Sequence, residues 1–470
     1  MKYIFLLISL FTFNFLQAQV TGVVKDAAGE PIPGANVFWM NTTNGVTTNE
    51  DGNFSIHKPA RSHMLVVSFI GFENDTIHVD KGNQQLDIVL REGVELSEVN
   101  VVTRKLGTMK LRTSVMNEDM ISSAELTRAA CCNLGESFVT NPSVDVSYSD
   151  AATGAKQIKL LGLSGTYVQM MTENIPNFRG AAAPYGLGYV PGPWMQSIQV
   201  SKGSSSVKNG YESITGQINV EFKKPQLPEA DWVSANLFAS STNRYEANAD
   251  ATVKLSKRWS TSLLAHYENE TKSHDSNDDG FVDIPRVEQY NVWNRWAYMG
   301  DHYVFQAGIK ALHETRNSGQ IAHGNTPSHD LYEIGIKTNR YEAFTKNAYI
   351  FDKEKNTNLA LILQGTLHNQ DANYGRKLYD VDQSNFYASL LFETELSKQH
   401  SLSAGLSFNY DGYDQNYRLT NQAEEGLTKK FVKESVPGAY VQYTFNLNDQ
   451  LMLMGGIRGD YSSEYGFFWM

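Results

Sequence analysis

The stretch that decides the fold is WMQSIQVSKGSSSVKNGYESITGQINVEFKKP, at residues 194–225. Apolar and polar residues alternate over 197–200, which predicts a short strand. Lys202 and Gly203 then open a turn, and a segment rich in small residues follows. The alternation returns over 216–222 and predicts a second strand. Periodicity alone therefore predicts a compact α+β unit built on these two strands.

The order of residues within this stretch carries a more specific signal than its periodicity. It resembles the closing segment of the plug domain of TonB-dependent outer-membrane receptors, whose pattern is I-x-x-I-x-V-x-K-G-x-x-S-x-x-Y-G-x-x-x-I-x-G-x-I-N-I. Gly210-Tyr211 inverts the usual Tyr-Gly order. The residues that match are Ile198, Val200, Lys202, Gly203, Ser206, Gly210, Ile214, Gly216, Ile218 and Asn219. The resemblance implies a plug domain followed by a transmembrane antiparallel β-barrel.

Composition bounds the class of protein. The chain has 470 residues, enough for about two to four domains, and its net charge of -11 argues against nucleic acid as a partner. Its mean hydropathy is -0.38, and beyond the N-terminus no run of about 18 apolar residues offers a membrane helix. A membrane barrel stays open, because barrel strands alternate apolar and polar residues. The 24 Tyr, 23 Phe and 36 Gly against 2 Cys favour that class over a cytosolic enzyme.

The N-terminus carries an export signal. Residues 1–18 contain Lys2, an apolar run and a small-residue cleavage site that ends at Ala18. This arrangement is typical of a secretory signal peptide, and we expect Gln19 to be the mature N-terminus. Together with the resemblance, it predicts the outer membrane of a Gram-negative bacterium as the location.

Residues 19–92 form the first predicted domain, a small β-sandwich. Short alternating stretches are separated by turn signals at 26–29, 44–45 and 50–52, which gives about seven strands in about 70 residues. The segment resembles the carboxypeptidase regulatory-like domain. That domain contains no catalytic machinery, so its presence does not make the chain an enzyme.

Residues 93–105 link the sandwich to the next domain. An extended segment of this kind is either a plain linker or a strand that another sheet captures. Its position resembles that of a TonB box, which implies the TonB energy-transducing complex as a partner. The residues of the predicted box are Leu96, Ser97, Glu98, Val99, Asn100, Val101 and Val102.

Residues 106–227 contain the elements of a plug in the family order. Ser122 and Glu125 form a capping-box pattern, which predicts a short helix. Later motifs match in order and depart in their charged details, with Leu161 in place of Arg and Glu173-Asn174 in place of Asp-Gly. These departures leave the predicted fold unchanged and put the details of any plug mechanism in doubt.

Residues 228–470 show the barrel pattern. Over 401–410, Leu and aromatic residues fall on one face and small polar residues on the other. Segments of about 10 residues repeat this alternation and are joined by tight and long connections in turn, which predicts tight periplasmic turns and long extracellular loops. The predicted long loops are 272–288, 314–331 and 411–430. We count roughly eleven strands, whereas a plugged barrel needs about 22. We therefore interpret the sequence as a C-terminally incomplete receptor in contact with outer-membrane lipid.

One predicted extracellular loop has oxygen-bearing residues at alternate positions with Gly280 at the turn, as a calcium loop requires. Arg286 stands where an EF-hand places its last carboxylate, so an EF-hand is not expected and a solvated polar loop is the favoured alternative. Calcium would be the one candidate cofactor. Its ligands would be Asp275, Asn277, Asp279 and Asp283.

Sulfur-bearing residues of the plug form a second candidate site. Cys131 and Cys132 are adjacent, which is poor geometry for a disulfide, and Met170 and Met171 lie in a neighbouring segment. Soft sulfur ligands favour copper(I) or a related metal, and vicinal cysteines also resemble those of receptors that handle heavy metals. The favoured alternative is a pair of small buried residues or a redox pair.

Other candidate chemistry is weaker. His313, His323 and His329 lack the spacing of a metal site, so surface histidines are favoured over metal ligands. The sequence contains no nucleophile, zinc-protease or phosphate-binding motif, which argues against an exported peptidase or any other enzyme.

The function that the sequence predicts is TonB-dependent uptake of a scarce ligand into the periplasm. A small ligand or metal complex is expected, with copper or an iron-siderophore as the first candidates. Two alternatives stay open. The chain could import a glycan or a peptide, or it could be a barrel-anchored surface receptor or adhesin that transports nothing.

Overall fold

The computed structural model divides the chain into two compact units, Met1–Val101 and Val102–Met470, which are described separately. The structure describes residues 19–26, 29–40, 42, 44–59, 63–69, 72, 75–79, 85–90, 108–110, 117–129, 132–139, 141–163, 165–203, 206–225, 232–321, 331–421, 426–447 and 451–470. The predicted signal peptide at 1–18 lies outside these residues.

The first unit is a β-sandwich of seven strands, as predicted. One sheet has the order β4-β1-β7 and the other has the order β3-β2-β5-β6. Alternate residues point inward, so that Val20, Val37 and Trp39 are fully buried in the shared core. The strands are β1 (Gln19–Lys25), β2 (Asn36–Trp39), β3 (Gly45–Thr47), β4 (Asn53–His57), β5 (Met64–Ser68), β6 (Asp75–His78) and β7 (Gln85–Val89).

The second unit begins with an α+β plug. Its main sheet has six strands in the order β13-β12-β15-β14-β9-β8, and β10 and β11 form a separate antiparallel pair. The strands are β8 (Thr108–Lys110), β9 (Asn117–Ser122), β10 (Val144–Asp150), β11 (Ala155–Leu160), β12 (Val168–Thr172), β13 (Ile175–Pro176), β14 (Met195–Lys202) and β15 (Gly216–Phe222). The two strands predicted in the deciding stretch are β14 and β15, which pair antiparallel at the centre of this sheet.

The helices of the plug are short. Helix α2 (Ser123–Arg128) begins after Ser122, whose Oγ accepts a hydrogen bond from the backbone N–H of Glu125, so the predicted capping position is confirmed. Single turns of 3-10 helix follow as η1 (Leu134–Glu136), η2 (Gly165–Tyr167), η3 (Gly180–Ala182), η4 (Gly186–Tyr189), η5 (Gly192–Trp194) and η6 (Val207–Asn209). Among the described residues, no helix has the length and apolarity needed to cross a membrane.

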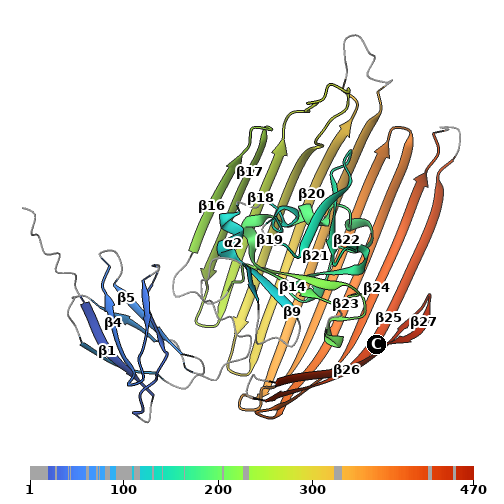
Figure 1. The fold of residues 1–470 in the computed structure, drawn as a ribbon. Helices are drawn as coiled ribbons and strands as arrows, with labels where there is room; N and C mark the ends of the chain where they lie inside the picture. The colour runs from blue at the N-terminus through green and yellow to red at the C-terminus, as the bar shows by residue number, and fades with distance from the viewer. Residues whose placement is uncertain are drawn as a thin grey trace, which may run out of the picture. The chain divides into compact units, whose positions relative to one another are not determined.

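A twelve-stranded antiparallel meander forms the rest of the unit (Figure 1). The sequence count of eleven is therefore one strand short, because the last strand has only four residues. The strands are β16 (Trp232–Ala239), β17 (Arg244–Lys254), β18 (Trp259–Glu270), β19 (Arg286–Met299), β20 (Tyr303–Gly319), β21 (Glu333–Asp352), β22 (Thr357–Tyr374), β23 (Lys377–Ser397), β24 (His400–Arg418), β25 (Thr428–Leu447), β26 (Leu451–Ser462) and β27 (Gly466–Trp469).

Several strands are much longer than the expected length of about 10 residues. β23 has 21 residues, and β20 continues through residues 314–319, which the sequence assigned to a loop. The prediction was wrong there because those residues are polar on both faces and give no hydrophobic alternation. Backbone pairing continues without it, since ladder hydrogen bonds do not require apolar side chains.

The two faces of the sheet differ in polarity as predicted. Leu406 on β24 is 58% exposed, whereas Ser403 on the same strand is buried. On β22, Leu367 faces outward and His368 faces inward and is fully buried. On these two strands the outward positions are thus mostly apolar and the inward positions mostly polar, as in the wall of a transmembrane barrel.

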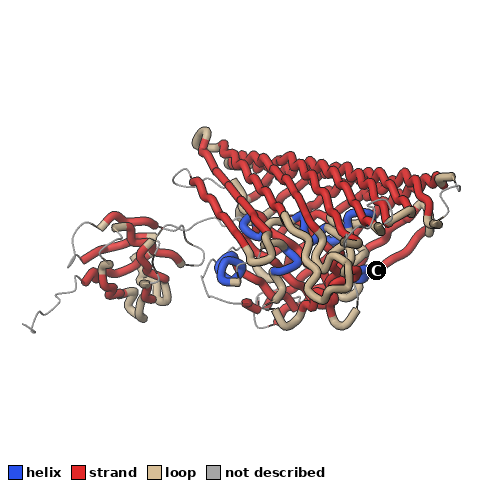
Figure 2. Tube along the Cα trace, turned by 90° about the horizontal axis from the view of Figure 1, so that it is seen from above, coloured by secondary structure: helices blue, strands red, loops and turns tan. Residues whose placement is uncertain are grey.

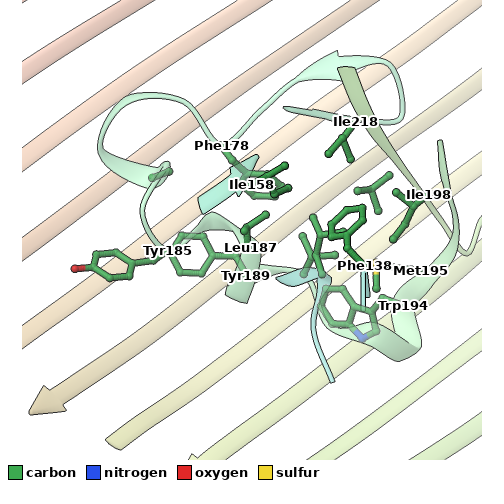
Figure 3. Close-up of a cluster of buried hydrophobic side chains, with 14 of the residues drawn as sticks. Phe138, Ile158, Phe178, Tyr185, Leu187, Tyr189, Trp194, Met195, Ile198 and Ile218 are labelled. Carbon is green, nitrogen blue, oxygen red and sulfur yellow. The ribbon is translucent and has the colours of Figure 1, made fainter. Parts of the chain in front are cut away.

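The sheet curves around the plug, which lies against its inner face (Figure 2). A cluster of buried apolar side chains spans both parts, and Figure 3 labels members of it that belong to the plug. Trp194 and Phe222 from the plug meet Trp293 on β19, and the Phe222 and Trp293 ring centroids are 4.6 Å apart. The plug and the wall therefore share one core, with polar contacts around it.

Candidate functional site

A buried ion pair fastens the plug to the wall near this core. Glu173, in the turn between β12 and β13, lies 2.6 Å from the guanidinium of Arg295 on β19. The Nζ of Lys346 donates a hydrogen bond of 2.7 Å to the backbone carbonyl of Glu173. Burial acts to raise the pKa of the Glu173 carboxyl, but the charges of Arg295 and Lys346 outweigh it and hold that pKa below its ordinary value.

The departure of Glu173-Asn174 from the family pattern has a structural consequence. Both residues have positive φ, 51° for Glu173 and 62° for Asn174, in the left-handed region that glycine and asparagine enter most readily. Asn174 is held there by a hydrogen bond of 2.8 Å from its backbone N–H to Asn219. The turn thus combines a left-handed backbone with a carboxylate that reaches the wall.

Two further contacts fasten the plug to later strands. Arg179 forms ion pairs with Glu212 of the plug at 2.6 Å and with Asp411 on β24 at 3.0 Å. On η6, the backbone carbonyl of Val207 accepts a hydrogen bond from Arg458 on β26. Charged groups of the plug and of the wall therefore meet along most of the sheet.

A cavity of about 180 Å³ lies between the plug and the first wall strands. It opens beside residues 271–285, one of the long connections predicted to be extracellular. The plug contributes the turn at Gly154 and the segment around Tyr185, whose ring lies 4.9 Å from the guanidinium of Arg316. Here plug and outer strand ends together enclose space of ligand size.

Arg244 on β17 organises one side of the cavity. Its guanidinium forms ion pairs with Glu136 of the plug at 2.9 Å, with Glu246 at 2.7 Å and with Glu268 at 3.0 Å. Burial acts to raise the pKa of Glu136, but Arg244 and then Lys156 outweigh it and hold that pKa below its ordinary value. One cation thus joins the plug to two neighbouring wall strands.

The predicted TonB box, Leu96 to Val102, lies outside the described residues. Cys131 also lies outside them, whereas Cys132 is 6% exposed and sits just before η1. Burial, and next the carboxylate of Glu246, raise the pKa of the Cys132 thiol well above its ordinary value. The thiol is therefore protonated at neutral pH, whereas a metal ligand must be a thiolate.

The predicted methionine ligands lie on β12. Met171 is fully buried and Met170 is partly buried against the shared core. Among the described residues, no three His, Cys, Asp or Glu side chains are placed to hold one metal ion. The soft-metal site stays a prediction.

The oxygen-bearing residues of the predicted calcium loop bond mainly to the loop itself. Asp275 accepts hydrogen bonds from the backbone N–H groups of Asp279 and Gly280, and Asp283 accepts one from Ser276. Asn277 donates to the carboxylate of Asp279. Calcium binding by this loop stays a prediction.

The predicted histidine group is only partly described. His313 on β20 bonds to Asn339 of the neighbouring strand at 2.8 Å. His323 and His329 lie outside the described residues.

The cavity itself was not predicted. Its charged lining comes from alternate inward residues of β17 to β20 and from distant plug segments that contain Glu136 and Lys156. The alternation along each strand marks these residues as inward-facing, and this pattern was the one sequence signal that could have identified them. Nothing in the sequence indicates that Arg244 meets Glu136, because that contact depends on how the plug seats in the wall.

Comparison with known proteins matches two segments of the chain. Residues 20–102 match the profile of the CarboxypepD_reg-like domain, and residues 110–217 match that of the TonB-dependent Receptor Plug Domain. Residues 110–217 are thus a plug domain of the kind found in TonB-dependent receptors, and curated relatives of the chain carry that name. TonB-dependent receptors are outer-membrane β-barrel receptors and transporters, not enzymes.

One curated relative is the TonB-dependent receptor SusC of Bacteroides thetaiotaomicron, which is 28% identical over 245 residues. That alignment covers 49% of this chain and 24% of the relative. The matched region is thus about a quarter of the length of this receptor relative.

Two solved structures share the fold of this receptor. The "Copper transporter OprC" has a TM-score of 0.61 at 12% identity, over 75% of this chain and 55% of that chain. The ferripyoverdine receptor of the outer membrane of Pseudomonas aeruginosa has a TM-score of 0.62 at 14% identity, over 81% and 57%. At such identities the likeness concerns the fold alone.

Proposed function

We propose that this receptor takes up a scarce ligand across the outer membrane of a Gram-negative bacterium. The observation that carries the proposal is the seating of the plug against the polar inner face of a sheet whose outer face is apolar. In this position the plug obstructs passage along the inside of the wall. The ligand would enter from the long-loop end, where the cavity lies, and leave into the periplasm once the plug moves.

The energy for this movement would come from TonB. We propose that residues 96–102 add as a strand to a sheet of TonB, because backbone hydrogen bonds of an added strand give a firm grip with few side-chain requirements. Residues 1–18 would direct export. The partners are then the TonB complex, outer-membrane lipid and the ligand.

A metal ion or metal complex is the first ligand class that we propose. It is supported by adjacent Cys131 and Cys132 in the plug, and one neighbour in fold is named a copper transporter while another is a ferripyoverdine receptor. The protonated state of the Cys132 thiol means that a metal would have to displace the proton on binding.

The test is to grow cells with and without the gene under copper limitation and then under iron limitation. The measurements are growth rate and cellular copper and iron, in strains with and without TonB. The proposal predicts that the receptor raises the content of one metal only when TonB is present. A Cys131→Ser/Cys132→Ser variant that loses only copper would make the thiol pair part of the transport site.

Equal metal contents with and without the gene would contradict the metal class. The next ligands to test would then be glycans and peptides. If binding of a ligand to the cells persisted without any TonB-dependent accumulation, the surface-receptor alternative would hold instead.

A further inference from the structure

Glu270, at the end of β18, is a buried carboxylate that lines the cavity. The residue is 6% exposed, and although its backbone pairs with β17, its carboxylate makes no hydrogen bond or ion pair with any described residue. Arg244 lies directly opposite it on β17, but the guanidinium is already shared by Glu136, Glu246 and Glu268. A buried carboxylate without a partner is costly, so this position favours a cation supplied from outside the chain.

Gln289 on β19 gives a second, independent indication. Its residue is 1% exposed, and its Nε2 donates hydrogen bonds to the backbone carbonyl of Gly188 and to the carboxylate of Glu314. These two acceptors fix the orientation of the amide, because the flipped amide would place its oxygen against both. The Oε1 atom is then buried without a hydrogen-bond donor among the described residues, beside the same cavity.

The formal charges around the cavity also favour a cationic ligand. Carboxyl groups outnumber cationic groups there. All of these groups line the cavity except Glu246, which lies behind Arg244. The five carboxylates are Glu136, Glu246, Glu268, Glu270 and Glu314, and the three cations are Lys156, Arg244 and Arg316. By formal charge, carboxyl groups thus outnumber cations around the cavity, and a cationic ligand would offset the difference.

We propose that the cavity binds a cationic organic group of the ligand, an ammonium or a guanidinium, with Glu270 as its counter-ion. Gln289 Oε1 accepts a hydrogen bond from the same ligand. This inference rests on the proposed function, because it assigns the chemistry of the ligand that the receptor takes up.

The size and the lining favour an organic cation over a bare metal ion. The cavity of about 180 Å³ is far larger than a coordination sphere, and the described residues hold no set of three metal-binding side chains. Tyr185 and Leu187 line part of the space, which suits the carbon skeleton that carries a charged group.

The experiment is a calorimetric titration of the purified full-length receptor in detergent with two matched probes. Both probes are acetylated at the α-amino group, so that the guanidinium is the only charge of arginine amide, and citrulline amide replaces it with a neutral urea of the same shape. We expect arginine amide to bind at least about tenfold more tightly, as for a hydrogen bond to a charged group. Equal affinity of the two probes, or no binding of either, would overturn the proposal.

Variants assign the binding to Glu270. Glu270→Gln should remove the preference for arginine amide, while Glu288→Gln, on the outer face of the adjacent strand, should leave it unchanged. If both variants keep the preference, Glu270 is not the counter-ion. TonB-dependent uptake is measured separately. If uptake persists although arginine amide does not bind, this inference is refuted and the proposed function still stands.

Discussion

Arg295 on β19 and Glu173 in the plug form an ion pair across the plug–wall boundary, with 2.6 Å between Nη2 and Oε1. The two side chains are 1% and 3% exposed. Arg295 also donates to the backbone carbonyl of Lys223 at 2.9 Å, and its guanidinium lies 4.4 Å from the Trp293 ring. Removing Glu173 would therefore leave the buried Arg295 charge without a carboxylate, and removing Arg295 would leave Glu173 with Lys346 at 3.7 Å as its remaining ion-pair partner.

The change Arg295→Gln should destabilise the seated plug by about 3–5 kcal/mol, the usual cost of breaking a buried ion pair from one side. The measurement is urea unfolding of the purified receptor. Arg258→Gln is the control, because the Arg258–Asp301 pair is 53% and 71% exposed and should contribute nothing measurable. Equal effects of the two variants would show that the buried pair does not fasten the plug.

Two adjacent glycines on β26 test the close approach of η6 to the wall. A Cβ at Gly456 would lie 2.6 Å from Cγ2 of Val207, whereas a Cβ at Gly455 meets nothing within 4 Å. Gly456→Ala should therefore cost about 1–3 kcal/mol by overpacking. Gly455→Ala should leave stability unchanged. Urea unfolding measures both, and an unaffected Gly456→Ala variant would contradict the described contact.

The Cys132 thiol should be unreactive in the folded receptor at pH 8. Burial raises its pKa above the ordinary value of 9.0, so almost no thiolate is present to attack an alkylating reagent. The measurement is the extent of iodoacetamide labelling by mass spectrometry, in a Cys131→Ser background. Labelling of the urea-unfolded chain gives the reference, and equally fast labelling of the folded receptor would contradict the buried thiol.

The same shift predicts a pH dependence of stability. Below about pH 9 the thiol is protonated in both states, and above that pH only the unfolded chain ionises. The unfolded state then binds fewer protons, so stability should fall as pH rises above 9.0. Cys132→Ala should remove this contribution to the slope.

Where one face of a strand is apolar, the sequence was enough to predict both the strand and the direction of its faces. The alternation over 401–410 predicted the strand and the faces of β24, because outward residues such as Leu406 are apolar and inward ones such as Ser403 are small and polar. The end of β20 could not be predicted in this way. There Glu314 and Arg316 point at the plug and pair with each other, so their polarity reflects a charged interface rather than a solvated loop.

The candidate site depends on contacts that no local pattern contains. Arg244 and Glu270 are direct cross-strand neighbours, and pairing of two strands could have suggested an ion pair between them. In the structure, Arg244 instead forms ion pairs with three other carboxylates, and one of these belongs to the plug, 108 residues away in the sequence. The unpartnered state of Glu270 follows from that distant contact.

The most direct test of the account is the affinity of the periplasmic domain of TonB for the purified receptor. We predict that deleting residues 98–102 reduces binding below detection, because the captured strand is lost. Deleting residues 91–95, which shortens the same link equally, should leave the affinity unchanged. If both deletions bind TonB as well as the intact receptor does, residues 96–102 are not the TonB box and the proposed coupling is wrong.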